Sequence, residues 1–388
     1  MSFFLLTSAI KVFVVLNLIL VGVALLTLLE RRVCAWMQDR LGPNRVGPQG
    51  ILQPAADGLK NFLKEETSPA MADKALFTLA PIVSFVPAML TFGVIPFAAP
   101  LPTKWGVVPM VVADLPVGFL YILAIGSLGV YGIVLAGWAS NNKYALLGGL
   151  RASAQMISYE IALGMSTVAV LLLAGNVTLS QVIAQQQAAH AWFIIPLSVA
   201  FVIFFISALA ETNRLPFDLP EAEGELIAGY HTEYSAMKFS MFYIAEYSNM
   251  VTASALMATL FFGGWDIPFT TWDSTGDLSV LKTLATLVVF GFKTFVFLFT
   301  YIWVRWTLPR FRYDQLMALG WKVLLPLALL YITLLAVAIW FARIQLGWDY
   351  GPRMAWALGG LNLVLLIALV WWLDRGRIVS GSVQEEAA

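Results

Sequence analysis

The chain has 388 residues, of which 60% are hydrophobic and only 12% are charged, and its formal net charge at pH 7 is zero. The mean hydropathy of +0.81 excludes an ordinary soluble domain. One cysteine and two histidines provide no ligand set for an iron–sulfur cluster, a haem pair or a zinc site, and no glycine-rich nucleotide-binding loop is present. We therefore expect an integral membrane protein that binds no metal ion, redox cofactor or nucleic acid of its own.

Apolar runs of about twenty residues or more recur along the chain, and a helix of that length spans a hydrocarbon core of about 30 Å. The runs cover residues 3–29, 75–97, 113–139, 154–174, 191–210, 239–262, 280–304, 323–342 and 354–373. The first run is too long and too closely followed by others to be a cleaved signal peptide. We predict an all-α, polytopic membrane protein with about nine transmembrane helices, forming one integral membrane domain over residues 1–388.

The basic residues predict the orientation of these helices. The loops after the first, third, fifth and seventh runs, together with the C-terminal tail, carry most of the 23 Lys and Arg residues. The opposite loops carry only Lys104, Arg343 and Arg353. Because basic loops stay on the cytoplasmic side, the odd-numbered loops are predicted to be cytoplasmic and the N-terminus to lie outside.

The first cytoplasmic loop is long and contains a helical pattern. In "ILQPAADGLKNFLKEET" (51–67), apolar residues recur at helical spacing, and Asp57, Lys60 and Lys64 occupy the intervening face. This pattern predicts a short amphipathic helix along the membrane surface or against a partner, although a solvated face with snorkelling lysines fits equally well.

The loops on the opposite side are plainer. Residues 96–109, 175–190 and 263–279 are rich in Pro, Gly, Ser and Thr and are predicted to be turns and short connectors.

Three of the ionisable residues in the predicted spans lie well away from the span ends, where a charge costs several kcal/mol. They are Glu160, Glu246 and Lys293. Each of these side chains can belong to a satisfied ion pair or hydrogen bond whose only role is to fix helix packing. Two acids at comparable depth, close to an acidic loop, favour a path for protons or cations instead. Gln155 and Tyr247 are among the polar side chains around these acids that can hold ordered water.

The acidic loop is the segment "ETNRLPFDLPEAEGELIAGYHTEY" (211–234), which crowds carboxylates that repel one another. Its acids are Glu211, Asp218, Glu221, Glu223, Glu225 and Glu233. Arg214 and the start of a short helix relieve part of this repulsion. Because apolar residues interleave the acids, we interpret the segment as a hydrated cluster that shares protons, rather than as a solvent-exposed acidic loop.

The same segment, extended as "ETNRLPFDLPEAEGELIAGYHTEYSAMKFSMFYIAEY", resembles the acidic loop and sixth helix of the H-subunit family of respiratory complex I, the proton-pumping NADH:quinone oxidoreductase. Four other segments agree with that family in the same order. They are "ERRVCAWMQDRLGPNRVGPQGILQPAADGLKNFLKE", "DLPVGFLYILAIGSLGVYG", "AGWASNNKYALLGGLRASAQMISYE" and "RWTLPRFRYDQLMALGWKVLLP".

The resemblance implies a protein at the heel of the membrane arm that acts only within a translocase. The family forms much of the entrance and tunnel for quinone, the substrate, and its glutamates couple quinone reduction to proton translocation. FMN and iron–sulfur clusters are expected in partner subunits. The expected partners are the antiporter-like membrane subunits, the peripheral quinone-module subunits, membrane lipids and quinone, and the expected location is a bacterial inner membrane.

The resemblance also assigns roles to residues of this chain. The quinone-binding candidates are Arg31, Asp57, Lys60, Arg214, Phe217 and Asp218. The proton-path candidates are Glu160, Glu211, Glu221, Glu223, Glu225, Glu233 and Glu246. Secondary candidates are Asp73, Lys293, Arg305, Arg310, Arg312 and Asp314.

The chain departs from the family pattern at two places. Asn61 stands where the amphipathic segment calls for an apolar residue. Beyond a family-like core of about 1–343, residues 353–388 add a ninth helix and a tail. The sequence leaves three roles open for this addition: local packing, lipid contact or binding of a partner.

Three other functions remain open from the sequence. The chain can belong to a membrane-bound hydrogenase or related ferredoxin-linked complex that reduces no quinone. A free-standing transporter would require inverted repeats, and no convincing repeat is visible. A purely structural anchor for the peripheral subunits predicts that removing the carboxylates within the spans affects assembly alone.

Overall fold

The computed structural model of the chain describes residues 2–218, 229–268, 270–273 and 277–374. These residues form helices almost throughout, with one short antiparallel hairpin. The α-helices are α1 (Ser2–Met37), α2 (Gln53–Leu63), α3 (Lys74–Thr91), α4 (Gly118–Ala139), α5 (Lys143–Ala174), α6 (Leu179–Ala189), α7 (Ser198–Glu211), α8 (Ala236–Phe261), α9 (Val280–Thr307), α10 (Tyr313–Ala318), α11 (Leu325–Trp340) and α12 (Pro352–Asp374). The predicted all-α, polytopic class is confirmed.

Every predicted apolar run contains a helix, although not all of these helices are equally suited to cross a membrane. In the described part of the chain, seven helical stretches are long and apolar enough to do so. They are Phe4–Met37, Lys74–Val94, Gly118–Ala139, Lys143–Ala174, Val280–Thr307, Tyr313–Gln345 and Pro352–Trp371. Helix α7 is apolar but has only 14 residues. Helix α8 has 26 residues and carries Lys238 and Glu246.

Two helices begin at positions that hydrophobicity does not indicate. Helix α5 starts at Lys143, well before its apolar run, because the side chain of Asn142 caps it by accepting a hydrogen bond from the Tyr144 amide at 2.9 Å. Helix α7 starts at Ser198, later than its apolar run, and Pro196 lies in the turn that precedes it.

The prediction that the opposite loops contain only turns and connectors is wrong at two places. Strands β1 (Leu101–Thr103) and β2 (Gly106–Val108) form the hairpin, with Leu101 opposite Val108. Residues 179–189 form α6 because Leu179, Val182, Ile183 and Gln186 recur at helical spacing and are buried.

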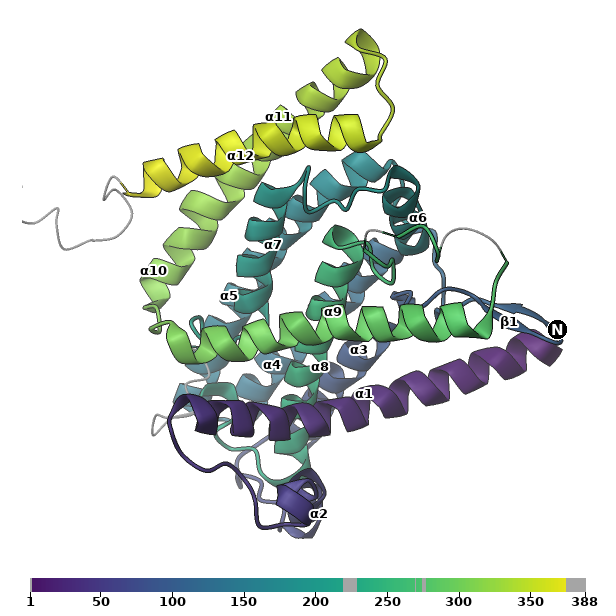
Figure 1. The fold of residues 1–388 in the computed structure, drawn as a ribbon. Coiled ribbons are helices and arrows are strands. Elements are labelled where there is room, and N and C mark those ends of the chain that lie inside the picture. Colours follow the sequence, from purple (N-terminus) through teal and green to yellow (C-terminus); the bar gives the residue numbers. More distant parts are fainter. Residues whose placement is uncertain (1, 219–228, 269, 274–276, 375–388) are drawn as a thin grey trace, which may run out of the picture.

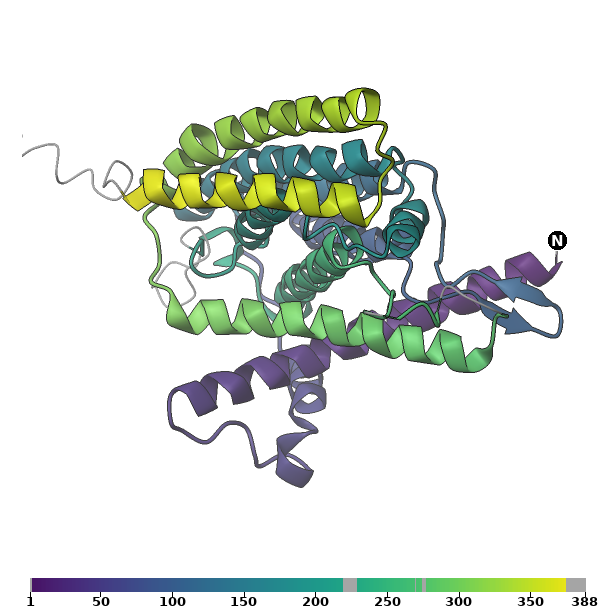
Figure 2. The same ribbon diagram turned by 45° about the horizontal axis from the view of Figure 1, so that its top comes forward.

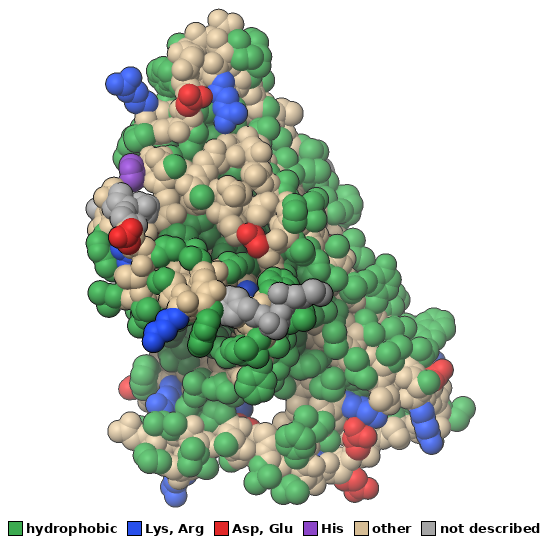
Figure 3. Space-filling model, turned by 90° about the vertical axis from the view of Figure 1, so that its right-hand side faces the viewer, with side chains coloured by type: hydrophobic (Ala, Val, Ile, Leu, Met, Phe, Trp, Pro, Cys, Tyr) green, Lys and Arg blue, Asp and Glu red, His purple; other side chains and the backbone are tan. Residues whose placement is uncertain are grey.

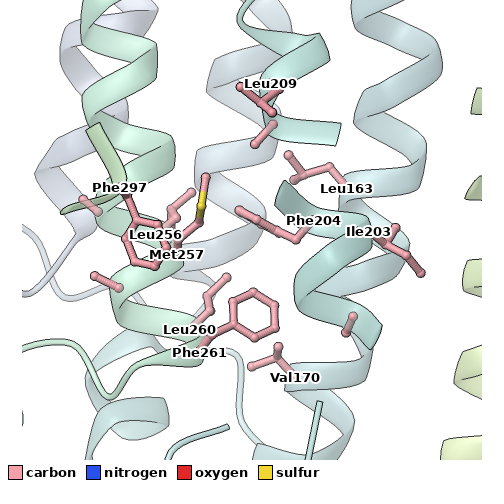
Figure 4. Packing of buried hydrophobic residues seen from close by; sticks show 14 of the residues in the cluster. Leu163, Val170, Ile203, Phe204, Leu209, Leu256, Met257, Leu260, Phe261 and Phe297 are labelled. Atoms are coloured by element: carbon pink, nitrogen blue, oxygen red, sulfur yellow. The ribbon is translucent and has the colours of Figure 1, made fainter. Parts of the chain in front are cut away.

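Helices α5 and α8 are the centre of the bundle. Helix α5 packs against α4, α7 and α11, whereas α8 packs against α1, α3 and α9 (Figures 1 and 2). Between them, Phe204 of α7, Phe261 of α8 and Phe297 of α9 point into a common hydrophobic core (Figure 4). Between membrane helices, close van der Waals packing of such side chains stabilises the bundle, because lipid is as apolar as the side chains themselves.

Helix α2 lies apart from this core, below α1 in Figure 1. None of its residues is buried, and Leu59, Phe62 and Leu63 are more than half exposed. The amphipathic helix predicted for this loop therefore forms with an apolar face that lipid or a partner can cover. Figure 3 shows the face that carries the N-terminus and the hairpin, where charged side chains gather mainly along the lower edge and are sparse above it.

Candidate functional site

A groove of about 490 Å³ lies between α1, α2 and α8. Aliphatic and aromatic side chains line most of it, and Arg31, Asp57 and Lys60 bring three predicted quinone-binding side chains together on its wall. The Arg31 guanidinium pairs with the Asp57 carboxylate at 2.6 Å and so joins α1 to α2. The volume is typical of pockets that bind small molecules, about 300–1,000 Å³.

A second pocket of about 180 Å³ adjoins the groove and leads inward. The two spaces share Tyr243 and Tyr247 of α8, and the inner pocket extends to Glu30, Cys34 and Arg305. An apolar groove therefore ends at a buried carboxylate.

Glu30 is the acid at which distant parts of the chain meet. Its Oε1 lies 3.2 Å from Arg214 Nη1 and also pairs with Arg305 Nη1, and its Oε2 accepts a hydrogen bond from the Tyr247 hydroxyl at 2.6 Å. These partners come from the loop after α7, from α9 and from α8. We call Glu30, Arg214, Tyr247, Glu246 and Arg305 the Glu30 network.

Arg214 extends this network to a second acid. Its Nε lies 2.7 Å from Glu246 Oε1, and its guanidinium carbon lies 4.2 Å from the centre of the Tyr247 ring. Burial by itself lowers the pKa of the guanidinium, but the charges of Glu246 and Glu30 outweigh burial and raise the pKa of Arg214 above its usual value. Arg214 therefore stays charged in a buried site. Its ion pairs join acids of α1 and α8, which lie outside the acidic loop that we expected it to neutralise.

Gln155 of α5 holds the chain around Arg214 in place. This side chain is fully buried, and its Nε2 donates to the carbonyl oxygens of Ala210 and Phe217 at 2.8 and 2.9 Å and to Asn213 Oδ1 at 3.0 Å. These three acceptors lie on both sides of Arg214 in the sequence. One amide group thus fixes the path of residues 210–217.

A small cavity of about 40 Å³, lined by both polar and apolar side chains, adjoins the network. Glu211 and Glu246 both line it, together with Asn249 and Tyr230. The volume accommodates about two or three water molecules. Glu160 of α5 is half-buried and close enough to Glu211 for their charges to interact. The structure thus brings together three of the predicted proton-path acids.

Known proteins are similar in sequence to most of this chain. The family model described as NADH dehydrogenase matches residues 10–336. The chain belongs to the NADH dehydrogenase family.

Its relatives are named as components of one kind of complex. The first H subunit of NADH-quinone oxidoreductase from Geobacter metallireducens is 52% identical over 322 residues, which cover 83% of this chain and 93% of the relative. NADH-ubiquinone oxidoreductase chain 1 of Chondrus crispus is 50% identical over 333 residues, covering 86% and 97%. The H subunit of NADH-quinone oxidoreductase from Thermomicrobium roseum is 51% identical over 337 residues, covering 84% and 95%. These relatives confirm the resemblance to the H subunit of complex I.

Two more predicted residues of this family member meet beside the site. Arg310 Nη2 lies 3.5 Å from Asp218 Oδ2 and connects the chain after α9 to the chain after α7. Phe217 is buried, stacks on Phe311 with 5.6 Å between ring centres, and packs near Tyr159. It belongs to the hydrophobic core and is not among the residues that line the groove.

Other predicted residues lie elsewhere. Glu233 accepts a hydrogen bond from Asn142 at 2.7 Å, and Asp73 caps α3 by accepting from two main-chain amides at 3.0 and 3.3 Å. Arg312 and Asp314 are exposed at the start of α10. Three of the predicted proton-path acids lie outside the described residues: Glu221, Glu223 and Glu225.

Lys293 of α9 is not part of the Glu30 network. Its Nζ donates to the carbonyl oxygens of Phe262, Gly264 and Asp266 at 2.7, 3.0 and 2.6 Å. These carbonyls follow the last residue of α8, so the ammonium group caps the C-terminal end of that helix. Burial raises the pKa of the neighbouring Asp266, whose carboxylate accepts a hydrogen bond from Trp192 at 2.6 Å.

We expect Lys293→Met to lower the thermal stability of the protein without changing its affinity for quinone. Hydrogen bonds from a charged group contribute about 1.5–3 kcal/mol, so the free energy of unfolding should fall by about 2 kcal/mol. The melting temperature and the KM for quinone measure the two effects. Lys104→Met, at an exposed position between β1 and β2, is the control. A raised KM at an unchanged melting temperature would contradict the capping role.

The main omission of the sequence-based assignment is Glu30, together with the roles of Tyr247 and Gln155. Glu30 is the single acid in "LLERR" at the end of a long apolar run, which is a recognisable signal for a buried carboxylate. Its partners are 184, 217 and 275 residues away in the chain, so no local pattern identifies them.

Proposed function

We propose that this chain is a membrane subunit of a proton-translocating NADH:quinone oxidoreductase, in which the groove between α1, α2 and α8 admits the quinone. In this proposal the Glu30 network couples quinone reduction to proton transfer toward Glu211 and Glu160. The observation that carries the proposal is the continuity of these groups. Tyr247 lines the groove and binds Glu30, and Arg214 joins Glu30 to Glu246. Glu246 then shares a small cavity with Glu211.

The groove suits a lipophilic substrate with a polar headgroup. Its apolar lining suits an isoprenoid tail that enters from the lipid, where close van der Waals packing and not removal from water holds it. Arg31 and Lys60 at its wall, and Arg305 in the inner pocket, are hydrogen-bond donors for quinone oxygens. The relatives' names include quinone and ubiquinone, which favours this substrate over the hydrogenase-linked alternative.

The chemistry that this chain supplies is electrostatic. Two electrons, delivered from iron–sulfur clusters of partner subunits, convert the quinone to a dianion, which takes up two protons to form the quinol. Negative charge in the inner pocket competes with Glu30 and Glu246 for the two arginines, because charges interact strongly where water is largely excluded. That competition raises the proton affinity of Glu246 and, through the shared cavity, of Glu211. Glu160 then passes the proton toward antiporter-like partner subunits.

The proposal places the chain in a bacterial inner membrane with its N-terminus outside. The groove, α2 and the acidic loop then lie on the cytoplasmic side, where peripheral partner subunits deliver electrons.

Glu211→Gln and Glu160→Gln, each in the assembled complex, test the relay. An amide keeps the shape of the side chain but cannot bind and release the proton. Proton-transfer groups contribute about 10²–10⁴-fold to rate, and we expect both quinone-dependent NADH oxidation and proton pumping to fall by a factor at the lower end of that range. A pH-sensitive dye in sealed vesicles measures pumping.

Glu65→Gln, an exposed acid in the loop after α2, is the matched control for both variants. The amount of assembled complex separates a relay from an anchor, because an anchor predicts loss of assembly alone. Wild-type turnover and pumping in both relay variants would remove these two acids from the mechanism.

A further inference from the structure

A second groove, of about 410 Å³, opens on the far side of the bundle between α7, α11 and α12. Figure 1 shows α12 crossing α11 at the margin of the fold. The groove is lined by aliphatic side chains that include Leu330 and Leu334 of α11 and Leu365 and Ala368 of α12. It shares no lining residue with the groove beside α2.

Helix α12, which forms one wall, begins beyond the residues that match the family model. It is nevertheless firmly attached. Asn362 is fully buried, donates to the Pro196 carbonyl at 2.6 Å and accepts from the Tyr331 hydroxyl at 2.8 Å. Because Pro196 lies before α7 and Tyr331 lies on α11, one amide binds α12 to both other walls. The groove is therefore a fixed feature of the fold.

The groove has a charge at one end only. Lys322 is the single charged residue among those that line it in the described chain, and its side chain is exposed. Beside it, Trp321 donates to Ser158 Oγ at 3.0 Å and so holds this end of the groove against α5. A lysine and a tryptophan at the end of an apolar helix are typical of the membrane interface, where basic side chains meet lipid headgroups.

The length of the groove matches one leaflet of a bilayer. Lys322 and Leu334 both line it and are twelve positions apart, which corresponds to about 18 Å along a helix. Half of a hydrocarbon core of about 30 Å is about 15 Å. An acyl chain whose headgroup lies at Lys322 thus reaches the other end of the groove.

We infer that this groove binds one anionic phospholipid, with an acyl chain between α11 and α12 and the phosphate at Lys322. The additional C-terminal helix then serves to complete a lipid site. The inference does not depend on the quinone function, because it uses a different groove.

The test uses the assembled complex and photoactivatable phosphatidylglycerol that carries a diazirine in its acyl chain, with the corresponding phosphatidylcholine as the neutral probe. Mass spectrometry of the labelled peptides locates the label. We expect phosphatidylglycerol to label α11 and α12 about fivefold more than phosphatidylcholine, which is the factor for about 1 kcal/mol from one lysine at an anionic headgroup.

Two variants separate the contribution of the lipid headgroup to binding from that of the acyl chain. Lys322→Gln should reduce the phosphatidylglycerol label to the phosphatidylcholine level, whereas Ala368→Trp should fill the groove and remove both labels. Val364→Trp, an exposed position on α12 that does not line the groove, should leave both labels unchanged. Equal labelling by the two lipids in the wild-type protein would overturn the inference. So would disulfide crosslinking of an Ala368→Cys variant to a neighbouring protein of the complex, because protein would then cover the groove.

Discussion

Replacing Arg214 with methionine should abolish quinone-dependent NADH oxidation by the assembled complex. The methionine leaves Glu246 and the nearly buried Glu30 without the cation that joins them, although Arg305 remains beside Glu30. Breaking a buried ion pair from one side costs about 3–5 kcal/mol, which corresponds to a factor of about 10²–10³ or more in any equilibrium that requires the intact site. The experiment measures two rates for the same complex: NADH oxidation with quinone as the acceptor, and NADH oxidation with a soluble electron acceptor that does not use the groove.

Three further variants make this expectation specific. Arg353→Met, at an exposed position, should leave turnover unchanged. Arg214→Lys keeps the charge but has no planar fork to reach both acids, so turnover should be intermediate. The double variant Glu246→Gln with Arg214→Met removes the cation together with one of the acids that it neutralises. We expect a larger amount of assembled complex from this double variant than from Arg214→Met alone. An Arg214→Met complex with wild-type quinone turnover would show that the network has no part in the reaction.

Replacing Gln155 with leucine should produce the second large effect, without removing any charge. Leucine removes the hydrogen bonds to the Ala210 and Phe217 carbonyls and to Asn213, although the Ala210 carbonyl still accepts from the Asn213 amide at 3.3 Å. An unsatisfied buried acceptor costs about 1–3 kcal/mol, and we expect a total loss of about 3 kcal/mol. Residues 210–217 should then lose their fixed path and misplace Arg214. Both the melting temperature and quinone turnover should fall.

The control for this variant is Gln181→Leu, an exposed glutamine on α6. Gln155→Asn provides a graded comparison, because it keeps the amide but shortens the side chain by one methylene group. If Gln155→Leu lowered the melting temperature but left turnover at the wild-type level, the role of Gln155 in positioning Arg214 would be wrong.

The hydrophobic pattern is sufficient to locate the membrane helices, because each must present a long apolar surface wherever it lies in the bundle. The hydrophobic pattern does not predict where these helices begin, because a single capping residue or proline sets the first residue of a helix. Asn142 starts α5 ahead of its apolar run, and α7 starts only after Pro196. It also misses α6, whose buried face contains Leu179, Val182 and Ile183 but continues with glutamines, so that the apolar spacing is short.

Sequence reasoning identifies most members of the site but not their pairings. Glu246 stands out because a charge inside a predicted span needs a reason to be there, whereas Arg214 and Arg305 are assigned by the family resemblance. Glu30, the partner of both arginines, does not stand out, because ion pairs between helices depend on how the helices pack. Lys293 is a candidate functional residue by its sequence position, but its side chain caps a neighbouring helix. The sequence alone does not distinguish these two roles for a lysine within a span.

The Glu30 network has a consequence for the order of events. Two carboxylates and two guanidiniums add up to no net charge, and the Glu246 side chain is 22% exposed whereas that of Glu30 is 6% exposed. In the proposed mechanism a proton would therefore reach Glu246 before Glu30, and its arrival would leave a surplus of one positive charge. That surplus would favour electrons on a quinone in the adjoining pocket, and thermodynamic reciprocity requires that those electrons favour the proton equally. The proposal thus predicts that reduction and protonation promote each other, and that neither has to come first.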